Sequence, residues 1–282
     1  MNYYIVIPAH NEAIYIGLTL QSIVAQTKLP TKVVVVNDNS TDNTETIVSN
    51  FCKKHPYISL VNTTSNNQHL PGSKVIEAFY KGYHTLDENY DFIVKLDADL
   101  ILPNHYFETI IKHFKSDEKI GMCGGFAYVE KNNHWVLENL TNKDHIRGAF
   151  KAYRKACFND IGKLKKSMGW DTVDELLAQY HCWKIKTDES LIVKHLKPTG
   201  ALYNKEARYK QGEAFYKIGY SFTLAFIASL KLAFLKRTPL LFIDYIIGFY
   251  NAQKKQTQKL VTPQESKFIK ALRWKIIKRK LS

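Results

Sequence analysis

The sequence lacks the features that mark several classes of protein. Its 282 residues include only four cysteines, without a CxxC pair or a zinc-finger spacing, so we expect neither a disulfide framework nor a structural zinc site. No stretch of about 20 apolar residues is free of charge, which argues against a membrane-spanning helix. Repeats, low-complexity tracts and an N-terminal signal peptide are also missing, and we therefore expect a globular chain in the reducing cytoplasm.

Acidic residues are scarce at one end of the chain. Residues 1–120 carry 10 Lys and Arg against 13 Asp and Glu, a balance of −3, whereas residues 200–282 carry 17 against 4, a balance of +13. This asymmetry indicates chemistry in the front part and attraction of the basic tail to an anionic partner. The tail matches no recognised nucleic-acid-binding module, so we expect no nucleic-acid partner.

The front part alternates between short β-branched runs and helical patterns, the first of which places Ile14, Leu18 and Ile23 at helical spacing. This alternation is typical of an α/β fold in which helices cover both faces of a mostly parallel sheet. Ligands of such sheets bind beyond the carboxyl ends of the strands. The four predicted strands lie at residues 3–8, 32–36, 57–64 and 92–96.

Polar residues gather where three of these strands end, at residues 8–12, 37–40 and 97–99. Each cluster taken alone has an ordinary interpretation as a turn or a helix cap. Because the carboxyl ends of parallel strands meet at one edge of a sheet, three such clusters together predict a ligand site there.

Asp97 and Asp99 end the fourth strand one residue apart. Residues i and i+2 of a strand point to the same side, about 7 Å apart. Ionised carboxylates are rarely buried without a partner, and Mg²⁺ or Mn²⁺ is commonly held by one or two carboxylates together with substrate phosphates. The alternative is a solvated turn, but the position after an apolar strand favours a site for a divalent cation and a diphosphate.

Four segments together resemble the family 2 glycosyltransferases, which have the GT-A (Rossmann-like) fold: YIVIPAHNEAIYIGLTLQSI, VVVVNDNSTDNT, PGSKVIEAFYKG and FIVKLDADLIL. The resemblance covers roughly residues 3–200. It implies an inverting, metal-dependent transfer of a sugar from a nucleotide-sugar, by default a UDP-sugar, to a hydroxyl acceptor. It also implies a glycan or lipid-linked acceptor and a place in cell-surface glycan or polysaccharide synthesis.

The resemblance further implies roles for individual residues. A late histidine ligates the metal in some members of the fold, and His195 takes that place here, with a structural histidine as the alternative. Arg147 is expected to hold phosphate or acceptor, or to be surface charge. The implied nucleotide-sugar-binding residues are Pro8, Ala9, Glu12, Asp38, Lys74, Asp97 and Arg147, and the implied ligands of Mn²⁺ or Mg²⁺ are Asp97, Asp99 and His195.

The segment GWDTVDELLAQYHCW stands where the family has the helix with its Glu-Asp catalytic motif. Counted back from Trp183, Asp171 falls on the catalytic aspartate and Trp170 replaces the glutamate. Asp171, Asp174 and Glu175 are spaced i, i+3, i+4 and share one helix face. A carboxylate must accept the acceptor's proton, and we expect Asp171 to do so, with Asp174 as the second candidate. Glu175 is expected only to complement the helix dipole.

The predicted domains are a catalytic domain, residues 1–200, and a basic amphipathic helical extension, residues 201–282. The catalytic domain comprises a nucleotide-sugar half, 1–100, and an acceptor half, 101–200.

Charges interrupt the apolar stretches of residues 215–282, which favours helices lying on an anionic membrane surface over a span. We therefore expect a peripheral protein on the inner face of the cell membrane. The alternative is that these apolar faces pack on the catalytic domain or on a second subunit. In the last helix the shared apolar face comprises Phe268, Ile269, Leu272, Ile276 and Ile277.

Two other functions stay open. A nucleotidyltransferase cradles a triphosphate on a glycine-rich loop after the first strand, but here no glycine occurs in that loop before Gly17. A non-catalytic, membrane-docked nucleotide-binding protein is the second alternative, because Trp170 stands in place of a catalytic-motif glutamate.

Overall fold

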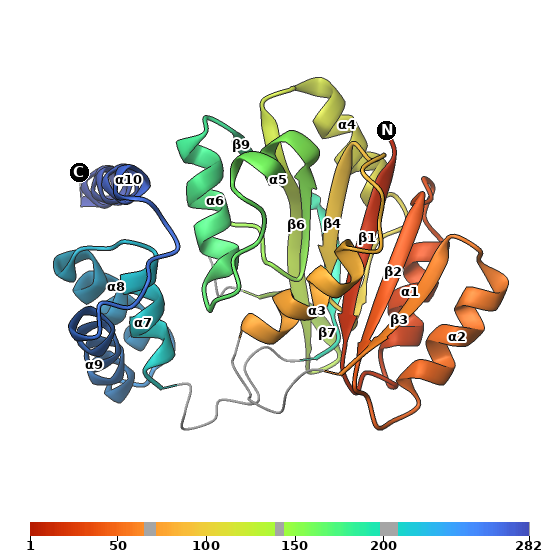
Figure 1. The fold of residues 1–282 in the computed structure, drawn as a ribbon, viewed down its shortest axis with the longest axis horizontal. Coiled ribbons are helices and arrows are strands. Elements are labelled where there is room, and N and C mark those ends of the chain that lie inside the picture. Colours follow the sequence, from red (N-terminus) through yellow and green to blue (C-terminus); the bar gives the residue numbers. More distant parts are fainter. Residues whose placement is uncertain (65–71, 139–143, 198–207, 282) are drawn as a thin grey trace.

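The computed structural model describes residues 1–64, 72–138, 144–197 and 208–281, and in these a nine-stranded sheet is flanked by helices, with four further helices at one side (Figure 1). The strands are β1 Tyr3–Ala9, β2 Lys32–Asp38, β3 Ile58–Thr63, β4 Phe92–Leu96, β5 Leu100–Ile101, β6 Ile120–Lys131, β7 His134–Leu137, β8 Phe150–Arg154 and β9 Lys184–His195. The helices are α1 Ile16–Val24, α2 Thr44–Lys54, α3 Ser73–Tyr83, α4 Tyr106–Ser116, α5 Lys155–Asp160, α6 Trp170–Tyr180, α7 Lys210–Lys217, α8 Phe222–Leu235, α9 Leu240–Lys254 and α10 Pro263–Leu281.

The strand order in the sheet is β3-β2-β1-β4-β8-β6-β9-β5, with β7 paired to β6. The first four strands of this order are parallel, and β1 and β2 end level with each other because Ala9 pairs with Asn37. The pairs β4–β8, β6–β8, β6–β7 and β5–β9 are antiparallel, whereas β6–β9 is parallel. The expected α/β fold is confirmed, and its parallel front half brings the polar strand ends to one edge.

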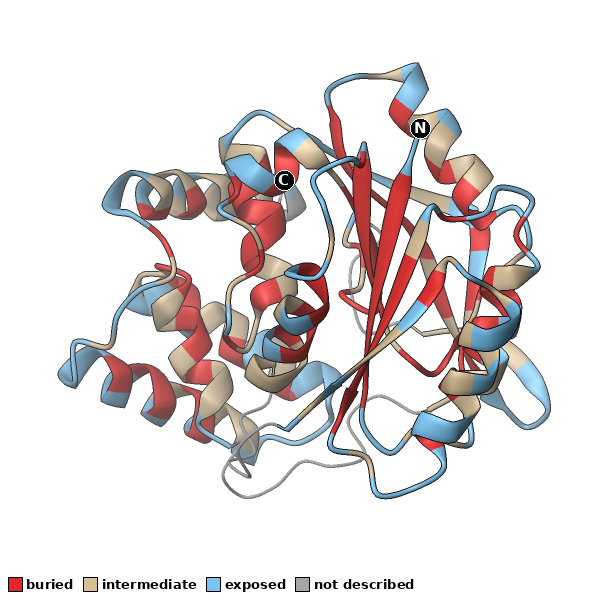
Figure 2. Cartoon of the chain, turned by 45° about the vertical axis from the view of Figure 1, so that its right-hand side comes forward, coloured by how far each residue is buried: buried red, intermediate tan, exposed pale blue. Residues whose placement is uncertain are grey.

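Both faces of the front strands are buried. Val6, Val34 and Val36 lie so close to α3 that a Cβ on Gly82 would touch all three. The alternate residues, such as Ile5 and Val35, are also fully buried. Figure 2 shows the central strands buried between helices that expose their outer sides, whereas the edge strand β3 is only partly buried.

The first helix differs from the expected pattern. It begins at Ile16, and its buried apolar residues are Ile16, Leu20 and Ile23. Ile14 and Leu18 are exposed, so the helical spacing assigned to them was wrong. Residues 13–15 form a turn before the helix, in which the Tyr15 and Ile16 N–H groups donate to the Glu12 carbonyl.

The C-terminal part is helical, as expected, although the predicted boundary at residue 200 lies outside the described residues. Its last helix, α10, returns to the catalytic part and packs against α6, where the Phe268 and Tyr180 ring centroids lie 5.5 Å apart. Ile269 is fully buried there, and Leu272 packs on the same core. For these three residues of α10, the alternative of packing on the catalytic domain is therefore the one observed.

None of the helices in the described part of the chain has both the length and the apolar character needed to cross a bilayer.

Candidate active site

The carboxyl ends of β1, β2 and β4 surround a cavity of about 360 Å³. Its position beyond the ends of parallel strands is the one that α/β sheets use for ligands. Seven of the residues implied by the sequence line it: Pro8, Ala9, Glu12, Asp38, Lys74, Asp97 and Asp99. His10, Asn39 and Ala98, which belong to the three predicted polar clusters, also line it, together with Val75 and Ala78 of α3, which were not expected.

The polar residues after β2 hold the loop after β1 in place. The Asn11 backbone N–H donates to Ser40 Oγ at 2.9 Å, and Asn11 Oδ1 accepts from the Thr41 N–H at 2.8 Å. The Glu12 N–H donates to Thr44 Oγ1 at 2.8 Å. The loops after β1 and β2 are thus joined by hydrogen bonds, and these bonds hold the part of the cavity wall that the two loops form.

Glu12 connects this wall to the end of β9. Its Oε1 accepts from Lys197 Nζ at 2.9 Å. Burial raises the pKa of Glu12 above its usual range, and the hydrogen bond from Lys197 opposes that rise. A carboxylate and an ammonium from distant parts of the chain therefore meet at the cavity's edge.

The two aspartates after β4 have different partners. Asp97 forms an ion pair with Lys95, a lysine buried within β4, whereas Asp99 Oδ2 lies 3.4 Å from His195 Nε2. The turn between them is fixed by Thr19, whose hydroxyl donates to the Ala98 carbonyl at 2.8 Å. Burial raises the pKa of Asp97, and the Lys95 charge opposes this.

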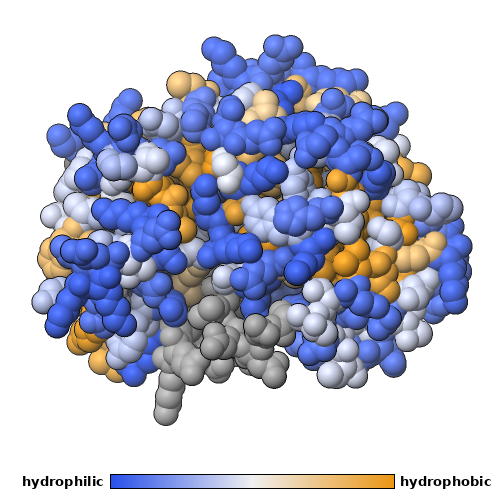
Figure 3. All heavy atoms as spheres, viewed as in Figure 1, coloured by the Kyte–Doolittle hydropathy of each residue, from blue (hydrophilic) through white to orange (hydrophobic). Residues whose placement is uncertain are grey.

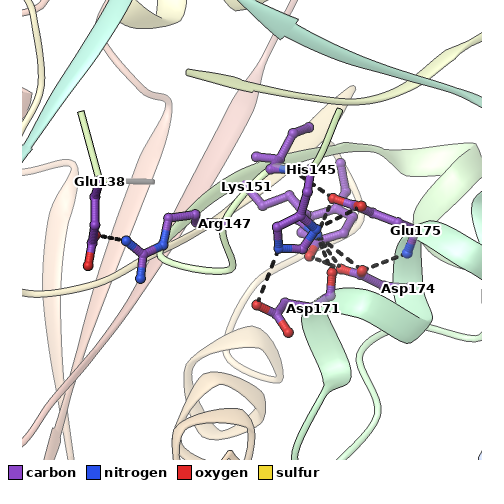
Figure 4. A network of polar contacts seen from close by, with 9 residues as sticks. Glu138, His145, Arg147, Lys151, Asp171, Asp174 and Glu175 are labelled. Atoms are coloured by element: carbon purple, nitrogen blue, oxygen red, sulfur yellow. Dashed lines mark hydrogen bonds and ion pairs between the residues drawn. The ribbon is translucent and has the colours of Figure 1, made fainter. Parts of the chain in front are cut away.

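His195 has a second carboxylate on its other side. Its Nδ1 lies 3.7 Å from Glu138 Oε2, and Glu138 also forms an ion pair with Arg147 (Figure 4). Burial lowers the pKa of Arg147, while the negative charges of Asp171, Asp97 and Asp99 raise it. The Arg147 guanidinium therefore interacts electrostatically with carboxylates of the cavity and of α6.

No group of three or more His, Cys, Asp or Glu side chains in the described residues is arranged as a ready metal site. The nearest approach to one is the pair Asp99 and His195, an oxygen and a nitrogen donor that Mn²⁺ accepts. Asp97, whose Oδ1 pairs with Lys95, is the next carboxylate along the chain from this pair.

Asp171 lies at the start of α6 with its side chain 35% exposed, and His145 is its main partner. His145 Nε2 is 3.8 Å from Asp171 Oδ2, and His145 Nδ1 is 2.9 Å from Glu175 Oε2 (Figure 4). Burial opposes ionisation of both groups, but their charged neighbours outweigh it. His145 and Lys151 lower the pKa of Asp171 to about 2, and Asp171 and Glu175 raise the pKa of His145 to about 9. At neutral pH a partly exposed carboxylate therefore lies beside an imidazolium.

Asp174 is in the opposite situation, with a side chain only 1% exposed. It accepts from Lys151 Nζ at 3.1 Å and from the Tyr153 hydroxyl at 2.5 Å. Glu175 is buried as well, 3.0 Å from Lys151 Nζ, and it accepts the Ile146 N–H at 2.9 Å. The expectation that Glu175 only complements the helix dipole was therefore wrong, since it joins α6 to β8 and to His145.

Four of these charged residues were not expected from the sequence: Lys95, Lys151, Glu138 and His145. Lys95 and Lys151 could have been predicted to form buried ion pairs, because a lysine inside an otherwise apolar strand requires a carboxylate partner. The contacts of His145 and Glu138 could not have been predicted, since both residues lie outside regular elements and their partners are far away in the sequence.

A family model described as "Glycosyl transferase family 2" matches residues 4–164. Among curated proteins, the chain is 33% identical over 144 residues to the "Probable glycosyltransferase YdaM" of Bacillus subtilis, a match that covers 50% of this chain and 33% of that protein. It is 24% identical over 234 residues to the poly-beta-1,6-N-acetyl-D-glucosamine synthase of Staphylococcus epidermidis, covering 72% of this chain and 52% of the synthase. The chain thus spans a third to about half of the length of these relatives.

Two solved structures are similar in fold. S. aureus TarS 1–349 in complex with UDP-GlcNAc has a TM-score of 0.59 at 17% identity, covering 82% of this chain and 67% of that one. The mannosyltransferase PcManGT from Pyrobaculum calidifontis, in complex with GDP-Man and Mn²⁺, has a TM-score of 0.57 at 15% identity, covering 90% of this chain and 75% of that one.

Proposed function

Because the chain belongs to glycosyl transferase family 2 and has the GT-A fold, we propose that it transfers a sugar from a nucleotide-sugar to a hydroxyl group of a glycan or lipid-linked acceptor, with inversion at the anomeric carbon. The observation that carries this proposal is the cavity at the carboxyl ends of β1, β2 and β4, with a partly exposed carboxylate, Asp171, at the start of α6. The TarS complex with UDP-GlcNAc supports a UDP-sugar as the donor.

In this proposal the donor's nucleotide occupies the cavity. Asp38 and Glu12 offer carboxylate oxygens that can accept from a base or ribose, and the half-buried Lys74 offers an ammonium to a phosphate. Arg147, paired with Glu138 beside the cavity, supplies a second cation toward the sugar and acceptor side.

A divalent cation fits the donor set of Asp99 and His195, with Asp97 as a third ligand. The PcManGT complex with GDP-Man and Mn²⁺ supports this assignment. When bound, the cation would neutralise negative charge on the leaving diphosphate.

Asp171 is the general base of the proposed reaction. Its carboxylate is ionised and accessible, so it can accept the proton of an acceptor hydroxyl as the new C–O bond forms. His145 holds that carboxylate in place, and the buried contacts of Asp174 and Glu175 with Lys151 fix the helix that carries it. Asp174 therefore acts as a positioning residue.

The proposed biological role is polysaccharide synthesis at the inner face of the cell membrane, with the cytoplasm supplying the nucleotide-sugar. The similarity to the N-acetyl-D-glucosamine polymer synthase supports the class of product.

The test is incubation of the purified chain with UDP-, GDP- and dTDP-sugars, with and without Mn²⁺. Metal-stimulated thermal stabilisation by one donor and release of free nucleoside diphosphate are expected. Asp99→Asn should abolish both, whereas Glu130→Gln, an exposed carboxylate on β6, should change neither. Release of pyrophosphate from a nucleoside triphosphate would instead identify a nucleotidyltransferase. Donor binding without turnover in the presence of glycan acceptors would identify a non-catalytic protein.

A further inference from the structure

Helices α8 and α9 leave an apolar surface uncovered. The exposed large apolar residues of α8 recur every four positions, and those of α9 are spaced by three and four. In each helix they therefore form a stripe along one side. With the exposed Leu235 they make up nine of the fifteen large apolar residues that are exposed in the described part of the chain. The stripes are Phe222, Phe226, Leu230 and Phe234 on α8, and Leu240, Ile243, Ile247 and Tyr250 on α9.

The two stripes belong to one surface, called here the α8–α9 surface. The rings of Phe226 and Phe242 lie 5.0 Å apart across the helix pair, and those of Phe222 and Phe249 lie 6.1 Å apart. Figure 3 shows apolar residues at the lower left of the molecule, where Figure 1 places α9.

The inner sides of these helices are already used. Ala225 and Phe249 are buried together with Phe215 of α7 in a small core of their own. On α10, in contrast, Phe268, Ile269 and Leu272 are covered by α6 and the main core. The α8–α9 surface is therefore the part of the C-terminal region that has no covering element among the described residues.

The charge around this surface has one sign. Residues 221–262 contain six Lys and Arg and a single acid, Asp244, which is buried and bound to Arg208 Nε at 2.8 Å. Three cations are exposed next to the apolar residues: Lys231 on α8, and Lys236 and Arg237 in the turn between the helices. Apolar side chains beside exposed cations, in a segment with a single acid, are the pattern of a segment that lies in the boundary of an anionic bilayer.

We propose that the α8–α9 surface docks on an anionic lipid bilayer. Its phenylalanine, leucine and isoleucine side chains enter the headgroup boundary, and Lys231, Lys236 and Arg237 contact lipid phosphates. A second copy of the chain fits less well, because residues 221–262 carry six cations and one buried acid, and pairing two such surfaces would bring like charges together. The proposal names the surface and the lipid charge behind the membrane location in the proposed function, and it does not depend on the transfer chemistry.

The test is co-sedimentation of the full chain with vesicles of phosphatidylcholine, either alone or with about 30% phosphatidylglycerol as the anionic lipid. The wild type should bind only the anionic vesicles and be released by high salt. Charge reversal at Lys236 and Arg237 should weaken binding by at least about tenfold, because each cation near an anionic leaflet contributes appreciably. The matched control reverses Lys275 and Lys278, two exposed cations of α10, and should retain most of the binding.

The apolar contribution is tested by Phe234→Gln with Leu240→Gln, compared with Leu18→Gln and Leu29→Gln, two exposed leucines of the catalytic part. Only the first pair should lose binding. The proposal is overturned by equal binding to neutral and anionic vesicles, by no binding at all, or by equal losses in a variant and its control. It is also overturned if sedimentation velocity shows a dimer that the Phe234 and Leu240 substitutions dissociate. Donor-induced thermal stabilisation, measured without lipid, reports separately on the proposed transfer.

Discussion

At the scale of single residues, the two candidate bases on α6 are distinguished by their surroundings. Asp171 is partly exposed and faces an imidazolium, whereas Asp174 is enclosed by Lys151 and Tyr153. The family match ends at residue 164, before this helix, so the assignment rests on spacing and geometry. A base must reach the acceptor, and only Asp171 of the two is accessible.

Replacing Asp171 by Asn keeps the shape of the side chain and removes its basicity. We expect donor affinity and melting temperature to stay near those of the wild type, while turnover falls by about 10²–10⁴. Steady-state kinetics together with a donor-binding isotherm measure this. An active Asp171→Asn enzyme would remove Asp171 from the mechanism.

Asp174→Asn should act through stability. The change leaves the Lys151 ammonium buried with one carboxylate partner fewer, which costs about 3 kcal/mol of the free energy of unfolding. Urea denaturation measures the loss. If Asp174→Asn is as stable as the wild type yet inactive, the roles of the two aspartates are reversed.

His145 links activity and stability to pH. It faces Asp171 and Glu175 of α6, and the charge of Lys151 on β8 also acts on it. Its pKa in the folded protein, about 9, is above its unfolded value of 6.5. Its contribution to stability is therefore complete below pH 6.5 and is lost as the pH rises through 9, up to about 3 kcal/mol in total.

His145→Gln should remove that pH-dependent part of the stability. Because the imidazolium also lowers the pKa of Asp171, the variant should move the acid limb of the turnover–pH profile to higher pH. Unfolding curves at pH 6 and pH 9.5 and a pH–rate profile check both effects. If His145 has only a structural role, its replacement would change the pH dependence of stability but would leave the acid limb of the turnover–pH profile in place.

At the scale of elements, α7 and α9 pack closely against each other because each has a glycine at the contact. A Cβ on Gly248 of α9 would overlap the Tyr209 carbonyl, and one on Gly212 of α7 would overlap the Tyr245 carbonyl. Backbone approaches backbone at this crossing, so neither helix can move away without unpacking the small core of the C-terminal region.

Gly248→Ala should therefore lower the free energy of unfolding by about 1–3 kcal/mol, although alanine favours a helix. Gly17→Ala in α1 is the matched control, since its Cβ would meet only Ile47 Cγ2 at 3.6 Å. That change should be neutral or stabilise by up to about 1 kcal/mol. Thermal unfolding of the two variants compares them, and equal effects would mean that the α7–α9 crossing is loose.

At the scale of the whole molecule, the basic C-terminal region is not a simple appendage. The chain leaves the catalytic part, forms α7, α8 and α9, and then returns through α10 to α6 (Figure 1). Removing the region would uncover the catalytic core where Ile269 is buried. Point substitutions are therefore better tests of its role than truncation.

Ile269→Ala should destabilise the catalytic part by about 2–5 kcal/mol, because it leaves a cavity in a fully buried contact. Ile276→Ala, on the same helix but only partly buried, should cost less than about 1 kcal/mol. Urea denaturation of the full chain gives both values. If the two substitutions have the same small effect, α10 does not stabilise the catalytic part.

The sequence by itself determined the front of the molecule. Alternating β-branched runs and helical patterns, with polar clusters at 8–12, 37–40 and 97–99, were enough to predict a parallel sheet and the edge of the sheet at which the cavity lies. Each of these signals is local, because strand period, turn chemistry and the spacing of two aspartates are set by residues close together in the chain.

Only the tertiary structure decided which charges meet. Lys151 reaches Asp174, His195 reaches Asp99, and His145 reaches Asp171, each across more than 20 residues of sequence. It also decided that α10 packs on α6, whereas α8 and α9 keep an apolar side exposed. Side chains of the same type are buried in one helix and exposed in another because burial depends on which elements pack against the helix. The sequence of the helix alone does not specify those elements.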